Sequence, residues 1–162
     1  MDKVQLRQQL RGKLLKMTDE LCAEKSKKAF KNLISLPQFQ QASVIMMYLT
    51  MPNEIDTSDA VFYAWQQKKT VVMPKISWQK RRMIPVEINS LEKGFSTEVA
   101  GLRNPVKGRP IPFEEIDLGV TPGLGFEKMV TGLVGVGPIT TGFLQIKNLL
   151  RVNVVLLFQN KW

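Results

Sequence analysis

Two short apolar runs separated by one helix-like segment constrain the fold of this chain more than any other feature. The runs are SVIMMYLT at 43–50 and TVVMPKI at 70–76, and their length and composition are typical of buried strands. Between them lies TSDAVFYAWQQKK at 57–69, which predicts a helix capped at Thr57 or Ser58. This strand–helix–strand order predicts parallel neighbouring strands in an α/β sheet.

The N-terminal part of the chain predicts two helices. Leu6, Leu10 and Leu14 recur every four residues, which is the apolar stripe of an amphipathic helix. The TDE at 18–20 supplies an N-cap and early acidic residues for a second helix that we expect to run to about Leu33.

Three more strands follow in the second half of the chain, and Pro85 should place the first of them at a sheet edge. We predict them at 82–88, 116–127 and 152–158, with turns and loops over 89–115. The whole pattern predicts one domain over 1–162, a Rossmann-like three-layer α/β fold in which helices flank a mainly parallel sheet. Residues 129–162 are atypical of such a domain, because they contain no Asp or Glu.

The composition excludes several kinds of site. Cys22 is the single cysteine and histidine is absent, so neither an internal disulfide nor a histidine-based metal or nucleophile system can form. The charged start MDKVQLRQQLRGK does not resemble a signal peptide, and no apolar run reaches the roughly 18 residues that a bilayer span needs. We therefore expect a cytoplasmic protein without a membrane partner.

The net charge of +9 leaves three interpretations open. Nine Lys or Arg residues stand against four acidic residues in the first 31 positions. This excess suits a solvated basic surface, a nucleic-acid binder or a site for an anionic small molecule such as a nucleotide. No nucleic-acid recognition motif accompanies the charge, so we expect no nucleic-acid partner.

Two local features point to a ligand site. Lys3 and Arg7 share one face of the first helix, where an anion would offset their unfavourable interaction with the helix dipole. In YLTMPNEIDT at 48–57, Glu54 falls on a loop at the carboxyl edge of the sheet, where α/β proteins bind ligands. Each feature also has a plain alternative, a solvated basic face in the first case and an exposed loop carboxylate in the second.

Taken in order, these segments resemble the 5-formyltetrahydrofolate cyclo-ligase (5,10-methenyltetrahydrofolate synthetase) family. The resemblance spans almost everything up to Lys128, and the segments that carry it are, in order, KVQLRQQLRGKLLKMT, LPQFQQASVIMMYLTMPNEIDT, KKTVVMPKI, GLRNP and IDLGVTPGLGF. The resemblance implies an enzyme that uses ATP and Mg²⁺ to close 5-formyltetrahydrofolate to 5,10-methenyltetrahydrofolate, releasing ADP and phosphate. The partners it implies are ATP and a folate, with or without a polyglutamate tail, and we expect a monomer.

The resemblance also implies roles for individual residues. The ATP contacts fall on Lys3, Val4, Gln5, Leu6 and Arg7, with Lys3 and Arg7 as phosphate cations. The folate pocket falls on Leu49, Met51 and Glu54, with Glu54 accepting hydrogen bonds from the pterin, and Arg103 matches the basic residue of a loop that closes over the site. Two positions depart from the family, because Asn104 stands where Glu is usual and Glu127 where Asp is usual.

The glycine-rich segment after Lys128 departs much further. The family continues with a signature close to GNRLGRGGGYYDRFL, whose Arg and glycine amides hold phosphates and whose Asp binds Mg²⁺. Here the chain reads MVTGLVGVGPITTGFLQIK, which has no Arg, Tyr or Asp. The backbone amides of Gly132, Gly135 and Gly137 are the remaining candidates for ATP contacts, and no metal ligand can be assigned.

The genetic code relates the two strings. When the codons for VTGLV at 130–134 are read one base earlier, they can encode GNRLG, and ITTGFLQIK at 139–147 can encode YYDRFLADK. We therefore expect the residues from about Met129 onward to come from a shifted reading frame. If the printed chain is genuine, the alternative is an inactive or non-catalytic relative that binds folate or nucleotide. A dinucleotide-binding GxGxxG is excluded, because position 140 is Thr.

Overall fold

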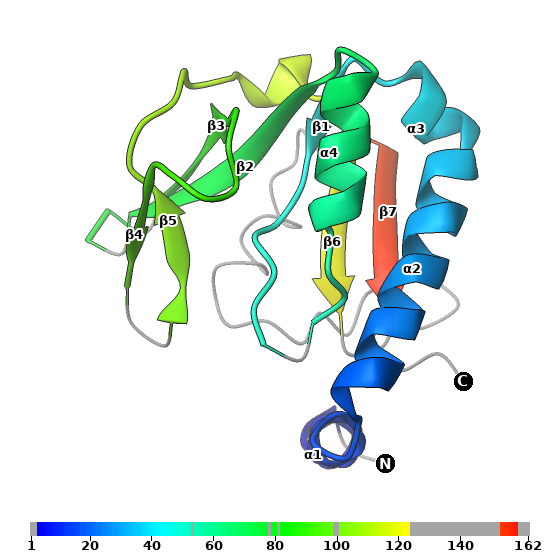
Figure 1. Ribbon diagram of the computed structural model, residues 1–162. Helices are drawn as coiled ribbons and strands as arrows, with labels where there is room; N and C mark the ends of the chain where they lie inside the picture. The colour runs from blue at the N-terminus through cyan, green and yellow to red at the C-terminus, as the bar shows by residue number, and fades with distance from the viewer. Residues whose placement is uncertain are drawn as a thin grey trace.

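The computed structural model describes residues 3–52, 54–77, 79–80, 82–98, 101–123 and 153–158 (Figure 1). At its centre is a five-stranded sheet in the order β3-β2-β1-β6-β7. The strands are β1 (Val44–Met46), β2 (Thr70–Ser77), β3 (Arg82–Glu87), β6 (Leu118–Gly123) and β7 (Asn153–Phe158). β1 is parallel to β2 and β6, β6 is parallel to β7, and the β2–β3 pair is antiparallel. The predicted fold class and the edge position of the Pro85 strand are confirmed.

Four α-helices accompany the sheet within the described residues: α1 (Lys3–Leu14), α2 (Asp19–Ser35), α3 (Pro37–Gln41) and α4 (Ser58–Gln66). Helices α2 and α4 cover one face of the sheet (Figure 1), where Leu33, Val61 and Ile45 are fully buried in the main core. On the opposite side, Ile111 and Ile116 pack in a second cluster with Met46 and Val72 of the sheet. None of the described helices is long and apolar enough to cross a membrane.

The helix caps agree with the sequence in one case and differ in the other. The Thr18 hydroxyl accepts a hydrogen bond from the N–H of Leu21 at 3.3 Å, so the predicted N-cap of α2 is confirmed. At α4 the N-cap residue is Thr57, as predicted, but no hydroxyl caps the helix, because those of Thr57 and Ser58 both act as donors elsewhere. The carboxylate of Asp56 caps this helix instead, accepting from the N–H of Ser58 at 2.9 Å.

A β-hairpin lies in the region that we predicted to be turns and loops. It consists of β4 (Phe95–Thr97) and β5 (Arg103–Pro105), paired antiparallel in a separate two-stranded sheet. The chain then passes along β3 through a bridge between Val86 and Pro110 and forms the short 3₁₀ helix η2 (Phe113–Glu115). These contacts cover the outer edge of β3.

Candidate functional site

The carboxyl ends of the parallel strands define the candidate site. The loop from β1 to α4 leaves the sheet at this edge, in the lower part of Figure 1. Helix α1 and the far end of the β4–β5 hairpin lie toward the same edge (Figure 1). Ligands of open α/β sheets bind at such an edge, because loops that follow neighbouring strands converge there.

Hydrogen bonds fix the path of the β1–α4 loop. The buried Tyr48 hydroxyl donates to the carbonyl oxygen of Ile55 at 2.7 Å. The Thr57 hydroxyl donates to the carbonyl oxygen of Tyr48 at 3.0 Å, and the N–H of Thr57 donates to the Thr50 hydroxyl at 3.1 Å. These bonds therefore join the two ends of the loop to each other.

Glu54 sits within this loop as a largely desolvated acid. Its Oε2 accepts a hydrogen bond from the N–H of Met51 at 3.0 Å, and its own N–H donates to the carbonyl oxygen of Met51 at 3.1 Å. Burial raises the pKa of the Glu54 carboxyl, and the bond from Met51 lowers it by a smaller amount. Burial, followed by the charges of Glu54 and Asp56, also raises the pKa of Tyr48 well above its usual range.

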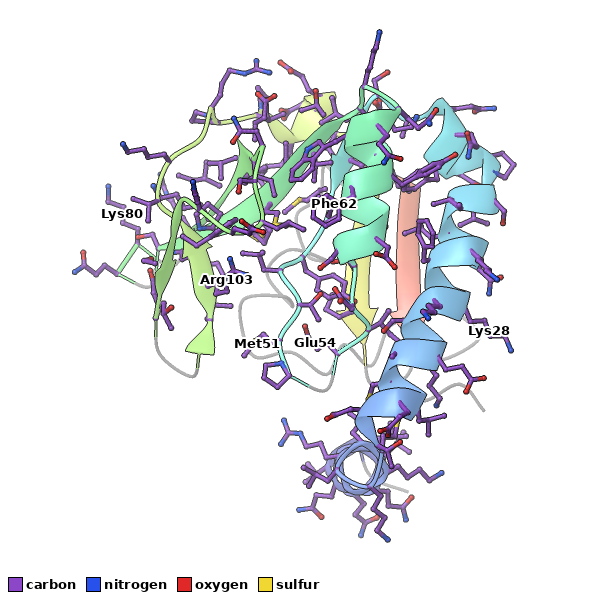
Figure 2. All side chains as sticks on the ribbon, viewed as in Figure 1. Lys28, Met51, Glu54, Phe62, Lys80 and Arg103 are labelled. Carbon is purple, nitrogen blue, oxygen red and sulfur yellow. The ribbon has the colours of Figure 1, made fainter. Side chains whose placement is uncertain are left out.

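Two apolar residues, Leu49 and Met51, precede Glu54 on the loop. Leu49 is half-buried and packs against the main core, and Met51 is half-buried beside the carboxylate. Figure 2 shows Met51 and Glu54 together on the loop that follows β1. An acidic group beside apolar side chains suits a flat heterocycle that carries N–H groups on one edge.

Arg103 lies on the β4–β5 hairpin, to the left of the β1–α4 loop in Figure 2. Its guanidinium lies over the ring of Phe95, 4.6 Å from the centroid, and donates a hydrogen bond to the carbonyl oxygen of Leu91. Both partners belong to the segment that enters the hairpin. The side chain is thus held against its own hairpin, and no described contact joins it to Glu54.

The five predicted ATP contacts of the N-terminal segment occupy the first two turns of α1. Val4 and Gln5 are exposed and Leu6 is half-buried, while the side chains of Lys3 and Arg7 lie outside the description. No acidic residue stands in the first turn of this helix, so an anion there would meet no repulsion from that turn.

Gly132, Gly135 and Gly137 lie outside the described residues. Within the described ranges, no three acidic or cysteine side chains come together in a way that could hold a metal ion. The structure therefore brings Leu49, Met51 and Glu54 together on one loop, with α1 and Arg103 on neighbouring elements of the same edge.

The fold and this edge define an α/β protein with a candidate small-molecule site at the ends of its parallel strands. A family model for the 5-formyltetrahydrofolate cyclo-ligase family matches residues 1–136. The chain belongs to this family, whose members are ATP-dependent ligases. The match ends inside the glycine-rich segment that departs from the family signature.

Two solved structures have a similar fold. One is the 5,10-methenyltetrahydrofolate synthetase of Aquifex aeolicus, with a TM-score of 0.75 and 22% identity over 96% of this chain and 76% of that one. The other is the 5,10-methenyltetrahydrofolate synthetase of Mycoplasma pneumoniae, with a TM-score of 0.60 and 20% identity over 79% of this chain and 68% of that one. At this level of identity both establish the fold.

Proposed function

We propose that this protein converts 5-formyltetrahydrofolate to 5,10-methenyltetrahydrofolate with consumption of ATP. The observation that carries the proposal is the position of Glu54, a largely buried acid on the β1–α4 loop of a cyclo-ligase family member. Its carboxyl is anchored to Met51 through Oε2, while Oε1 makes no described hydrogen bond. In the proposed complex, Glu54 accepts hydrogen bonds from N–H groups of the pterin, and Leu49 and Met51 line its apolar surface.

The nucleotide side of the site is proposed to begin at α1. Lys3 and Arg7 would neutralise the phosphates of ATP, with Val4, Gln5 and Leu6 beside it. The formyl oxygen attacks the γ-phosphorus and ADP leaves. The neighbouring folate nitrogen then attacks the formyl carbon, and the phosphorylated oxygen departs as phosphate. This route depends on positioning and charge neutralisation, so a protein nucleophile is not required.

Mg²⁺ would supply further neutralisation of the phosphates. Because no acidic cluster forms within the part of the chain that the structure describes, these residues do not fit a cage made by the protein alone. Magnesium is commonly held by phosphate oxygens and water in addition to one or two carboxylates. We propose that the protein acts as a monomer in the cytoplasm, on folates with or without polyglutamate tails.

An absorbance assay tests the proposal. Purified protein is mixed with 5-formyltetrahydrofolate, ATP and Mg²⁺, and formation of the methenyl product is followed, with omission of ATP as the control. ATP-dependent product formation is the expected result. Failure of the protein to bind 5-formyltetrahydrofolate in a separate titration would overturn the proposed function.

The second candidate function is binding of folate or nucleotide without turnover. It is favoured by the absence of Asp and Glu from 129–162, which removes the acid of the family signature. It applies only if the printed segment is genuine. Sequencing the encoding DNA and measuring the intact mass of the protein from its natural source test the shifted-frame hypothesis. Intact genes of related organisms that encode the same VTGLVGVGPITTGF segment would contradict it.

A further inference from the structure

Asn104, in the middle of β5, is one of three buried polar residues among those described, with 5% of its surface exposed. Its Oδ1 accepts from the N–H of Ile76 at 2.8 Å, and its Nδ2 donates to the carbonyl oxygen of Ile76 at 2.8 Å. The second hydrogen of Nδ2 goes to Oε1 of Glu98 at 2.7 Å. The polarity of the Ile76 backbone fixes which way the amide must point.

The amide of Asn104 occupies a place that a strand would otherwise fill. The carbonyl oxygen of Val72 in β2 accepts from the N–H of Met47 at the end of β1, so it faces the β1 side. Along a strand, the backbone groups of every second residue face the same side, so those of Ile76, four residues after Val72, also face the β1 side. β1 ends at Met46 and does not reach this part of β2. Asn104 therefore supplies the missing pair of hydrogen bonds with its side chain.

This contact ties the hairpin to the carboxyl end of β2. Lys75 adds a second bond from the same strand, donating through Nζ to the carbonyl oxygen of Val106 at 3.1 Å. The Lys75 bond is exposed, whereas the amide of Asn104 is buried and uses both donors. Arg103 directly precedes Asn104, so any rotation of the hairpin on β2 would move its guanidinium relative to the Glu54 loop.

We propose that Asn104 is a positioning residue: its amide clamps the β4–β5 hairpin to Ile76 and thereby places Arg103 beside the folate site. Only the placement of Arg103 beside the folate site rests on the proposed function. The clamp itself is a statement about the hairpin and can be tested without ligand. The chemical demand is specific, because the position must accept one hydrogen bond and donate two within one side-chain amide.

The test uses Asn104→Asp, which keeps the shape of the side chain but loses both donors and places a carboxylate against Glu98. Asn89→Asp, at an exposed loop position, makes the same chemical change away from the clamp. Hydrogen exchange of the β4 and β5 amides measures the clamp, and titrations measure the affinities for 5-formyltetrahydrofolate and for ATP. Glu98→Gln is measured alone and combined with Asn104→Asp. In this double variant the new amide at position 98 can donate to the new carboxylate at position 104.

We expect Asn104→Asp to speed exchange in the hairpin and to weaken folate binding by about tenfold or more, because Arg103 is no longer held in place. ATP affinity should change less than twofold, and Glu98→Gln should restore part of the folate affinity in the double variant. Unchanged hairpin exchange would overturn the clamp. Faster exchange with unchanged folate affinity would overturn the positioning role. If the wild-type protein binds no folate, the proposed function and the positioning role are both wrong. The hydrogen-exchange comparison still tests whether Asn104 clamps the hairpin.

Discussion

The N–H of Met51 donates a hydrogen bond to Oε2 of Glu54 at 3.0 Å, and the carbonyl oxygen of Met51 accepts from the N–H of Glu54. These two bonds hold Glu54 against Met51 on the loop that leaves the sheet at its carboxyl edge. Because the acid is mostly desolvated, its ionised form is less stable in the folded protein than in the unfolded chain. The turn thus holds a carboxyl whose charge reduces stability.

Stability should therefore depend on pH through Glu54. The pKa of this group is raised on folding from an unfolded value of about 4.3. The folded state then binds more protons over the interval between the two pKa values, so the free energy of unfolding should fall as pH rises above about 4 and level off above the folded pKa. In Glu54→Gln this fall should disappear.

Urea denaturation of both proteins between pH 4 and pH 8 measures the effect. Glu114→Gln, at an exposed position of η2, makes the same chemical change and serves as the control. A difference between wild type and Glu54→Gln that does not vary with pH would contradict the prediction.

The Tyr48 hydroxyl should contribute to the stability of the β1–α4 loop. Tyr48→Phe removes the buried donor to Ile55 and leaves that carbonyl oxygen without this partner, which should lower the free energy of unfolding by about 1–2 kcal/mol. Tyr63→Phe is the control, because the Tyr63 ring packs edge-on against Phe30 and keeps this contact without its hydroxyl. Equal losses in the two variants, measured by chemical denaturation, would contradict a specific role for the Tyr48 bond.

Gly108 should tolerate no side chain. Its φ is +150°, and a Cβ there would collide with the carbonyl oxygen of Glu87 and lie 3.2 Å from the Cβ of Val86. Gly108→Ala should therefore destabilise the protein by roughly 2 kcal/mol or more. The control is Gly12→Ala in α1, where the Cβ would meet nothing within 4 Å and helix propensity predicts a gain of up to about 1 kcal/mol. In thermal unfolding, the midpoint temperature should fall for Gly108→Ala and rise for Gly12→Ala.

Asp56 should be required for the start of α4. Asp56→Ala removes the acceptor for the N–H of Ser58, so we expect a loss of about 1 kcal/mol. Asp56→Asn keeps an oxygen at this position and should retain most of the stability. If the two substitutions lower the denaturation midpoint equally, the cap does not act through this oxygen.

The parallel sheet was predictable from the sequence because its strands are apolar runs that alternate with amphipathic helices. The position of Glu54 was predictable for a related reason, since it follows a strand that ends at the ligand-binding edge. β1 proved shorter than the predicted 43–50, because only Val44–Met46 pair with β2, and only Ile45 and Met46 also pair with β6. These features were predictable because each depends on the local sequence of one strand or helix.

The hairpin and the cap of α4 could not be read this way. β4 and β5 have three residues each, too few for an alternating pattern to be visible. Asn104 looked like a turn residue, and only its distant partner Ile76 explains its burial. Thr57 had the right residue type for a cap, but its hydroxyl is used by Tyr48 across the loop. In each case a contact between separate segments outweighed the local preference.

The short length and central position of β1 have a consequence for synthesis of the chain on the ribosome. β1 can pair with β2 soon after both emerge, but its other neighbour begins only at Leu118. At roughly 5–20 residues per second, the second edge of an apolar strand stays open for several seconds. During that interval it can pair with the same strand of a nascent chain on an adjacent ribosome. Slow translation between β3 and β6 would therefore favour aggregation of this protein before its sheet is complete.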